Sequence, residues 1–141
     1  MRITTRGRYA LRSALALARL SKNGETVSIT SLSEAEDISP IFLEQIFFNL
    51  KKHGIVKSVR GPGGGFAFNR PLETLSVRDI LNAAGEELDV LPCDRHLKEC
   101  NRINECNAHK TIVAISTMVN NYMSNLTIKM LLEDKDFCFP H

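Results

Sequence analysis

Three cysteines and a histidine lie close together in the second half of the chain, in the stretch CDRHLKECNRINECNAH. They are Cys93, Cys100, Cys106 and His109, spaced as C-x6-C-x5-C-x2-H. Thiolates and imidazoles are the side chains that bind zinc ions and iron–sulfur clusters. The stretch is therefore a candidate metal centre.

The spacing leaves more than one chemistry open. Structural zinc sites usually contain a C-x2-4-C knuckle, and the wider intervals here mildly favour a larger inorganic core such as an iron–sulfur cluster. A redox disulfide or a set of incidental free thiols would also fit the spacing. His96 and Cys138 could also act as ligands, although Cys138 stands between two phenylalanines and is expected to be a small buried side chain. His109 is favoured because only two residues separate it from Cys106.

Length and composition predict an ordinary globular chain that forms either one domain with its own core or a small domain with an added oligomerisation element. The 141 residues are 43% hydrophobic and 24% charged, and no repeat or low-complexity tract interrupts them. We expect no export signal, because no N-terminal segment combines a basic start, an apolar run and a small-residue cleavage site. We expect no membrane span either, because asparagines and a lysine interrupt the apolar stretch over 111–132. The chain is therefore predicted to be cytoplasmic. In that reducing compartment clustered cysteines bind metal or sense redox state more often than they form structural disulfides.

Charge is unevenly divided between the two halves. The net charge of the whole chain is +2, but residues 1–78 carry +6 and residues 79–141 carry −4. Only the first half is suited to bind a polyanion such as DNA.

The elements that would present this charge include a predicted helix-turn-helix. Ser28 is the expected N-cap of a short helix in VSITSLSEAED, and a second helix is bounded by Ser39, Pro40 and Gly54. The inner stripe of the second helix consists of large apolar side chains, namely Leu43, Ile46, Phe47 and Leu50. Two helices joined by a short turn form the motif that places its second helix in the major groove.

Three polar residues near the start of that second helix are candidates for DNA contact. Glu44 and Gln45 lie off the inner stripe, and Ser39 precedes the helix. Gln45 could pair with adenine, Glu44 could accept a hydrogen bond from the amino group of cytosine, and Ser39 could bind a phosphate. The alternative is that Glu44 and Gln45 form an ordinary solvated helix face.

The runs IVKSV and FAF flank the glycine-rich segment RGPGGG, a pattern that predicts a β-hairpin wing. A phosphate-binding loop is disfavoured, because no Lys-Ser/Thr pair follows the glycines and Phe66 occupies the last glycine position of GxGxxG. At the predicted tip, Gly61 and Gly63 would let the backbone approach DNA closely, while Arg60 could enter a minor groove.

Two further helices complete the first half. One is expected from Thr4 or Thr5 to Gly24, and the other between the N-cap Ser76 and Gly85.

A long helix is predicted after the cysteine-rich stretch. Residues 86–110 show neither helical nor strand periodicity. Beyond them, apolar residues recur at intervals of three and four, the pattern of a narrow helix–helix seam; they are Ile112, Ile115, Val119, Tyr122 and Leu126. We expect this seam to form a homodimer, and docking on the same chain is the alternative.

These patterns predict a mainly α fold with a small β-hairpin wing, a winged helix-turn-helix followed by a long C-terminal dimerisation helix. The predicted division is a DNA-binding domain over 1–85, a cysteine-rich cluster-binding loop over 86–110, a dimerisation helix over 111–132 and a tail over 133–141. A dimer of such readers would recognise a near-palindromic double-stranded DNA operator.

Several segments resemble one known family. LEQIFFNLKKHGIVKSVRGPGGGFAF, SVRDILNAAG, the N-terminal MRITTRGRYALRSALALA and the cysteine stretch are similar to the IscR-type iron–sulfur cluster regulators, the winged-helix family that includes NsrR and CymR. The resemblance implies a dimeric transcription factor and not an enzyme. It places DNA contacts on Ser39, Glu44, Gln45 and Arg60. It also implies that Cys93, Cys100, Cys106 and His109 hold a cluster, [2Fe-2S] as in IscR or [4Fe-4S] as in several nitric-oxide sensors.

Two positions depart from the family pattern. The first cysteine interval is one residue longer than the usual C-x5-C, and Arg8 stands where some NsrR proteins have an acidic ligand. Because arginine cannot ligate a metal, the second departure favours His109 as the fourth ligand. CymR-like members lack the cysteines.

The predicted function is therefore a regulator that senses iron–sulfur cluster status, oxygen or nitric oxide. A zinc-stapled winged-helix module for DNA binding or assembly is the main alternative. A redox or cluster-transfer enzyme is disfavoured because no catalytic constellation accompanies the cysteines.

Overall fold

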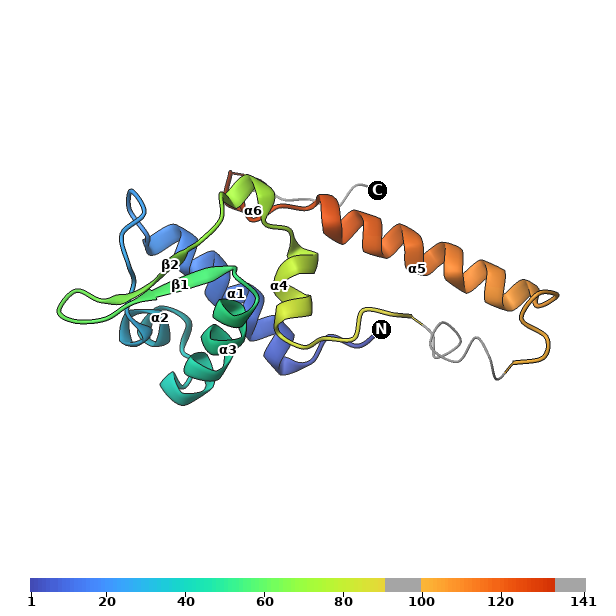
Figure 1. The fold of residues 1–141 in the computed structure, drawn as a ribbon, viewed down its shortest axis with the longest axis horizontal. Helices are drawn as coiled ribbons and strands as arrows, with labels where there is room; N and C mark the ends of the chain where they lie inside the picture. Colours follow the sequence, from blue (N-terminus) through green and yellow to red (C-terminus); the bar gives the residue numbers. More distant parts are fainter. Residues whose placement is uncertain (91–99, 134–141) are drawn as a thin grey trace.

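The computed structural model of the chain describes residues 1–90 and 100–133. Its elements form a helical body with a β-hairpin at one end and a long helix projecting from the other (Figure 1). In chain order the described elements are α1 (Thr5–Leu20), α2 (Ile29–Glu36), α3 (Pro40–Lys52), β1 (Val56–Val59), β2 (Gly65–Phe68), the 3-10 helix η1 (Leu72–Thr74), α4 (Val77–Ala83), α5 (Asn107–Asn125) and α6 (Ile128–Glu133). The predicted class, mainly α with a hairpin wing, is confirmed.

Helix α1 lies at the centre of the body and packs against α2, α3, α4 and α6. Its buried face consists largely of small side chains, since Ala10, Ala14 and Ala16 are fully buried beside Leu17. Alanines on a buried helix face let neighbouring helices approach closely, so one helix can contact several others. The helix ends at Leu20 rather than at Gly24, which instead adopts a positive φ in the following turn.

The helix-turn-helix forms as predicted. The Ser28 side chain accepts a hydrogen bond from the Ser31 N–H, Pro40 is the first residue of α3, and Gly54 follows the helix with a φ of 71°. The four residues of the predicted inner stripe of α3 are all buried: Leu43, Ile46, Phe47 and Leu50. Their burial fixes which face of α3 points outward.

A shared carboxylate holds α2 against α1. Glu36 Oε2 lies 3.1 Å from Arg12 Nε, and Glu36 Oε1 lies 2.7 Å from Arg19 Nη2. The Glu36 side chain is only 10% exposed, so both pairs are shielded from water on one side. These contacts position α2 and, through the turn, α3.

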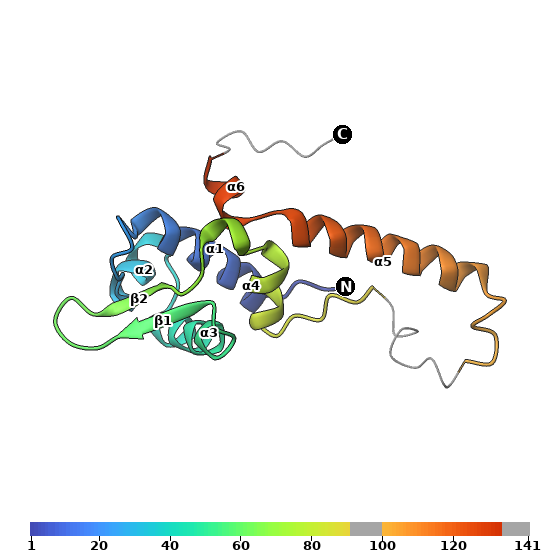
Figure 2. The ribbon, with the colours of Figure 1, turned by 45° about the horizontal axis from the view of Figure 1, so that its top comes forward.

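The hairpin is anchored to the body by a third extended segment. Strands β1 and β2 pair antiparallel, with Val56 opposite Phe68 and Val59 opposite Gly65. The backbones of Val27 and Phe66 exchange two hydrogen bonds of 2.9 Å. A Cβ at Gly65 would lie 2.3 Å from the Val27 carbonyl oxygen, so only glycine permits this approach. The hairpin projects beyond the helices while its base is held in place (Figure 2).

Helix α4 begins and stops as its sequence predicts. Ser76 and Asp79 form a capping box, and Gly85 follows the helix with a φ of 84°.

The single helix predicted over 111–132 is wrong in its bounds. Helix α5 begins at Asn107 and ends at Asn125, so the helix is interrupted at Leu126 and Thr127 before α6. At the break the Val77 N–H donates to the Leu126 carbonyl (2.8 Å) and the Ile128 N–H donates to the Leu75 carbonyl (2.9 Å). These bonds satisfy the Leu126 carbonyl and the Ile128 N–H, two backbone groups that would otherwise bond within a continuous helix.

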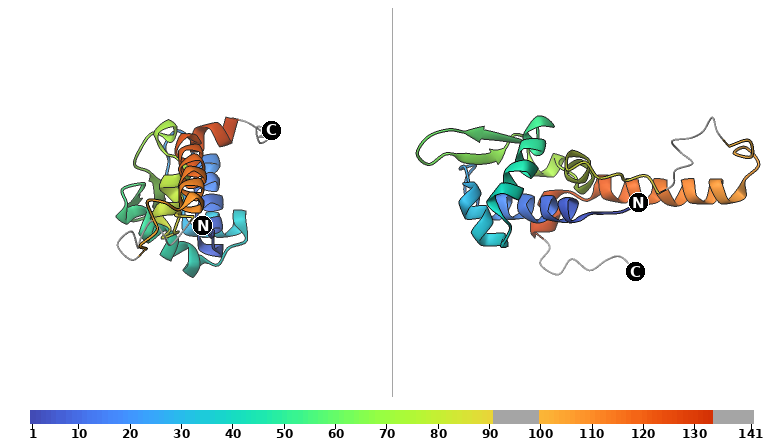
Figure 3. Two further views of the ribbon diagram at one scale, coloured as in Figure 1. Left: turned by 90° about the vertical axis from the view of Figure 1, so that its right-hand side faces the viewer. Right: turned by 90° about the horizontal axis from the view of Figure 1, so that it is seen from below.

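The break directs α6 back to the body, while α5 extends away from it (Figure 3). Ile128 is fully buried in the core formed by the first half of the chain. Near its C-terminal end α5 contributes Met123 to a second apolar cluster with Val77, Leu81 and Leu88. The first half of the chain and the C-terminal helices α5 and α6 therefore pack together in one structure. Across residues 1–90 and 100–133, none of the helices combines the length and apolarity that a membrane span requires.

Candidate nucleic-acid interface and metal centre

The outward face of α3 carries the predicted reading residues. Glu44 and Gln45 are both exposed, and together with Arg6 of α1 they line an open hollow of about 570 Å³. Because the opposite stripe is buried in the core, α3 is held rigidly with this face toward solvent. The structure thus brings Glu44 and Gln45 together on one accessible helix face.

Ser39 lies at the N-terminus of α3. It is exposed, and its side chain makes no capping hydrogen bond. The N–H groups of the first helical turn lack partners within a helix, and a helix N-terminus attracts anions. Ser39 is therefore placed where a DNA phosphate could accept hydrogen bonds from both its hydroxyl and this turn.

The wing tip is exposed from Arg60 to Gly63. Gly61 and Gly63 have φ values of 99° and 73°, and the Gly64 N–H closes the turn on the Gly61 carbonyl at 2.9 Å. A Cβ at Gly64 would clash with the Val59 carbonyl oxygen. The glycine run is therefore required by the turn, and it leaves Arg60 at the base of a slender tip.

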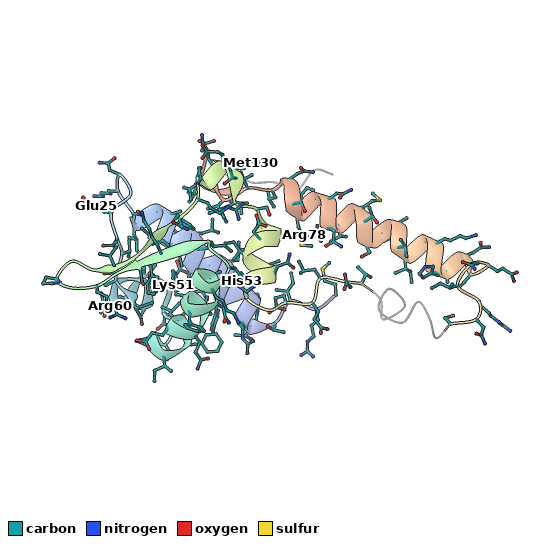
Figure 4. All side chains as sticks on the ribbon, viewed as in Figure 1. Glu25, Lys51, His53, Arg60, Arg78 and Met130 are labelled. Atoms are coloured by element: carbon teal, nitrogen blue, oxygen red, sulfur yellow. The ribbon has the colours of Figure 1, made fainter. Side chains whose placement is uncertain are left out.

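Basic side chains link the wing to α3. Lys51 Nζ donates to Ser58 Oγ of β1 at 2.7 Å, and Lys52 and His53 follow at the end of α3. Figure 4 labels Lys51, His53 and Arg60 on the half of the molecule that contains α3 and the hairpin, away from α5. The predicted polyanion surface is thus gathered around the helix-turn-helix and the wing.

Glu86 is a structural residue that no sequence pattern indicated. It is buried, and its carboxylate accepts hydrogen bonds from the Thr4 N–H at 3.0 Å, the Gly7 N–H at 2.9 Å and the Thr4 hydroxyl. The sequence predicts that Thr4 or Thr5 caps α1. Thr4 is the N-cap residue, but its side chain makes no capping hydrogen bond and its hydroxyl donates to Glu86 instead. The carboxylate caps α1 because it is a stronger acceptor for free N–H groups.

Opposing effects set the charge state of Glu86. Burial by itself would raise its pKa. The hydrogen bonds from the Thr4 side chain and from the Thr4 and Gly7 backbones, together with the nearby charge of Arg6, lower the pKa below its ordinary value. Glu86 therefore remains ionised and ties the segment that leads to the cysteines to the start of α1.

Three of the four candidate metal ligands, Cys100, Cys106 and His109, lie in the described residues that precede or begin α5. Cys100 is exposed and Cys106 is half-buried, and both are free thiols. Cys106 is the N-cap of α5, and its sulfur accepts a hydrogen bond from the His109 N–H at 3.4 Å. The Cys106 sulfur therefore lies at the N-terminus of α5, one helical turn before His109.

The His109 ring carries the clearest sign of a missing partner. Its Nδ1 atom is buried and has no hydrogen-bond partner in the part of the chain that the structure describes. A buried imidazole nitrogen without a partner is costly unless something binds it. The free thiols and this nitrogen are suitable donors for a cluster or a zinc ion.

The predicted ligand set is only partly described. Cys93 and the two further candidate ligands His96 and Cys138 lie outside the described residues. Within 1–90 and 100–133, no three His, Cys, Asp or Glu side chains converge closely enough to hold a metal ion. The set Cys93, Cys100, Cys106 and His109 stays a prediction.

The predicted seam of α5 is only partly open to solvent in the single chain, because its residues Val119 and Leu126 pack against the second apolar cluster. Ile115, Met118 and Tyr122 are all exposed, and Ser116 and Met123 are the buried residues of this helix. Ile115 and Tyr122 are the seam residues that remain exposed, and neither belongs to the cluster of Met123 that contacts the body. This helix therefore has apolar surface to offer to a second chain.

Comparisons with known proteins agree with this architecture. The family described as "Rrf2: Iron-dependent Transcriptional regulator" matches residues 3–134. The HTH-type transcriptional regulator IscR of Yersinia pseudotuberculosis is 34% identical over 136 residues, which are 96% of this chain and 82% of that protein.

Solved structures are similar along nearly the whole chain. The oxidized form of CymR from Staphylococcus aureus has a TM-score of 0.71 and 30% identity, covering 94% of this chain and 97% of CymR. IscR of T. potens has a TM-score of 0.74 and covers 100% of this chain and 93% of its own. At 24% identity, the second comparison supports the fold alone.

Proposed function

Because the chain belongs to the Rrf2 family of iron-dependent, helix-turn-helix transcriptional regulators, we propose that it acts as a homodimer controlled by an iron–sulfur cluster. In this proposal α3 enters the major groove of a near-palindromic operator, and Ser39, Glu44 and Gln45 contact it. Arg60, Gly61 and Gly63 of the wing contact the adjacent minor groove and backbone. The exposed outward face of α3 and its basic surroundings support this assignment.

The proposed cluster ligands are Cys93, Cys100, Cys106 and His109, and the proposed cluster is [2Fe-2S], with [4Fe-4S] as the second candidate type. The observation that carries this proposal is the buried Nδ1 of His109, which has no hydrogen-bond partner among residues 1–90 and 100–133 and lies one helical turn from the Cys106 sulfur. The free thiols at Cys100 and Cys106 are consistent with it. When bound, an iron–sulfur cluster supplies one-electron chemistry and sensitivity to oxygen or nitric oxide.

The chain connects the ligands to the DNA-reading surface at two points. On one side Cys106 and His109 belong to the first turn of α5, the proposed dimer helix. On the other side the segment that contains Cys93 follows Glu86, which is bonded to the start of α1. A rearrangement of the ligands would therefore act on both the dimer helix and the body that carries α3.

Metal and sulfide analysis tests this function. The protein is purified anaerobically, and iron, acid-labile sulfide and visible absorption are measured for the wild type and for His109→Ala. We expect equal amounts of iron and sulfide per chain in the wild type, and a lower content or a shifted spectrum in the variant. His53→Ala removes an exposed histidine from the opposite half of the molecule and serves as the control.

The zinc-stapled alternative predicts a different result. A colourless protein with one tightly bound zinc per chain and no sulfide would exclude the cluster and leave a winged-helix module without redox sensing.

A further inference from the structure

Two large apolar side chains lie on the outward face of α3. Ile41 is 70% exposed and Phe48 is 67% exposed. They occupy helical positions i and i+7, and Glu44 and Gln45 occupy i+3 and i+4, so all four residues share one face. Among the large apolar side chains in the described ranges, only Met118 of α5 is as exposed as these two.

The core does not account for these side chains. The inner stripe of α3 is complete, since Leu43, Phe47 and Leu50 are fully buried. Phe42, which lies next to Ile41, turns inward and packs edge-on against Tyr9 with ring centroids 5.5 Å apart. Ile41 and Phe48 therefore present apolar surface to whatever meets this face of α3.

The surroundings indicate a polyanion rather than an apolar partner. Ile41 and Phe48 line the same 570 Å³ hollow as Glu44, Gln45 and Arg6. Beyond Phe48 the helix ends in two lysines, one of which is bonded to the wing strand that leads to Arg60. Ile41 and Phe48 thus form an apolar pair surrounded by basic and polar side chains. This arrangement is complementary to the DNA major groove, where the charged phosphate backbone lies beside the apolar methyl groups of thymine.

We propose that Ile41 and Phe48 contact the C5-methyl groups of two thymines in the operator. Thymine alone among the DNA bases carries such a methyl group, and apolar side chains recognise it. This inference rests on the proposed function, since it requires α3 to enter the major groove. It adds an apolar component of sequence recognition to the polar contacts of Glu44 and Gln45.

Helix geometry sets the spacing of the two thymines. Seven residues at 1.5 Å per residue separate Ile41 and Phe48 by about 10 Å along the helix axis. Base pairs along each strand are about 3.4 Å apart, so the two methyl groups lie about three base pairs from one another when α3 follows the groove. The bases read by Glu44 and Gln45 lie between them.

Operator selection followed by methyl deletion tests this proposal. The anaerobically purified protein first selects its preferred duplex from a random-sequence library. Each thymine of that duplex is then replaced singly by deoxyuridine, which removes only the methyl group. We expect two positions in each half-site, about three base pairs apart, at which the replacement weakens binding about fourfold, the effect of one buried methyl group.

Variants assign each methyl group to a side chain. In Ile41→Ser the deoxyuridine effect should disappear at one position, and in Phe48→Ser at the other. Met130→Ser of α6, which is 49% exposed and lies far from α3, should retain both effects (Figure 4). Because the deoxyuridine series uses the wild-type protein, the test does not depend on how the variants fold.

The outcomes separate this inference from the proposed function. Selection of no sequence by the wild type, in either its metal-bound or its metal-free form, would overturn both. A selected operator without any deoxyuridine effect would leave DNA reading intact and overturn the methyl contacts. Deoxyuridine effects that persist in both variants, with weaker dimerisation of the variants in the absence of DNA, would assign Ile41 and Phe48 to a protein interface instead.

Discussion

Glu86 joins the start of α1 to the segment that follows α4. Its carboxylate accepts three hydrogen bonds from Thr4 and Gly7 across more than seventy residues of chain. A Cβ at Gly7 would lie 2.7 Å from the Glu86 side chain, so glycine makes room for the carboxylate. Glu86 thus holds the chain immediately after α4 against the start of α1.

We expect Glu86→Gln to lower the free energy of unfolding by roughly 2 kcal/mol at neutral pH, because hydrogen bonds to a charged acceptor are replaced by weaker ones. The pKa of Glu86 is lowered in the folded state from its ordinary value of 4.5. Its contribution is therefore complete above that value and is lost as pH falls through the folded pKa. Chemical denaturation of both proteins across this pH range measures the difference.

Glu34→Gln is the control, because Glu34 is an exposed carboxylate on α2. It should change stability by less than about 0.5 kcal/mol. A wild-type advantage over Glu86→Gln that grew on acidification would contradict the assigned sign of the pKa shift.

The polar residues at the ends of helices were partly predictable from sequence. Ser28 and Ser76 cap the helices that follow them, because a short side-chain oxygen can reach the N–H groups of the next turn. Glu86 was not predictable in this way. Its hydrogen-bond partners are remote in the chain, and a local residue pattern cannot predict a pairing between remote residues.

At the scale of elements, the wing depends on a close backbone approach. Gly65 lies opposite Val59 in the hairpin, and its missing Cβ makes room for the Val27 carbonyl. Thr26 supports the same contact, since its hydroxyl donates to the Gly63 carbonyl at 2.6 Å. The orientation of the wing tip therefore follows from its attachment to the segment before α2.

Gly65→Ala should lower the free energy of unfolding by roughly 2–3 kcal/mol, the cost of forcing an extra group into a packed contact. It should also weaken operator binding, because the wing would move away from Val27. Denaturation and a binding titration at fixed salt measure the two effects.

Gly24→Ala is the control for Gly65→Ala, because it adds backbone strain without forcing a Cβ atom against a neighbouring segment. Gly24 has a positive φ of 79°, but a Cβ there would meet nothing within 4 Å. We expect a loss of only about 1 kcal/mol and unchanged operator binding. Equal losses in the two variants would show that the contact with Val27 does not hold the wing.

The hairpin itself was predicted from the β-like runs on either side of the glycines. Its anchoring was not, because a single extended residue such as Val27 gives no strand signal in the sequence. The exposed apolar residues Ile41 and Phe48 were visible in the sequence, but only the burial of the opposite stripe shows that the core does not need them.

At the scale of the whole molecule, α5 is the longest described element and packs on the body near its C-terminal end. Its C-terminal end packs against α4 and the second apolar cluster, whereas its N-terminal part projects away from the body (Figure 1). The sequence pattern predicted an apolar seam here, and the seam residues Ile115 and Tyr122 are exposed. The break before α6 was not predictable, because it depends on hydrogen bonds to the start of α4.

Ile115→Glu should weaken the proposed dimer, since it would place a charge within an apolar interface. A loss of at least tenfold in dimer affinity is expected, given a burial cost above about 1.4 kcal/mol. Sedimentation over a concentration series measures the dissociation constant. Thr117→Glu, on another side of α5, should leave it unchanged; equal effects of the two substitutions would place the dimer interface elsewhere.

In the proposed function, the metal centre at the start of α5 controls DNA reading by α3 and the wing. The most direct test of this control is the affinity of the anaerobic protein for its selected operator before and after chelation of the bound metal, at one salt concentration. We predict a change of at least about fivefold in affinity, in the range of ordinary allosteric coupling. The same affinity in both states, together with the same sequence selected from a random library, would contradict it.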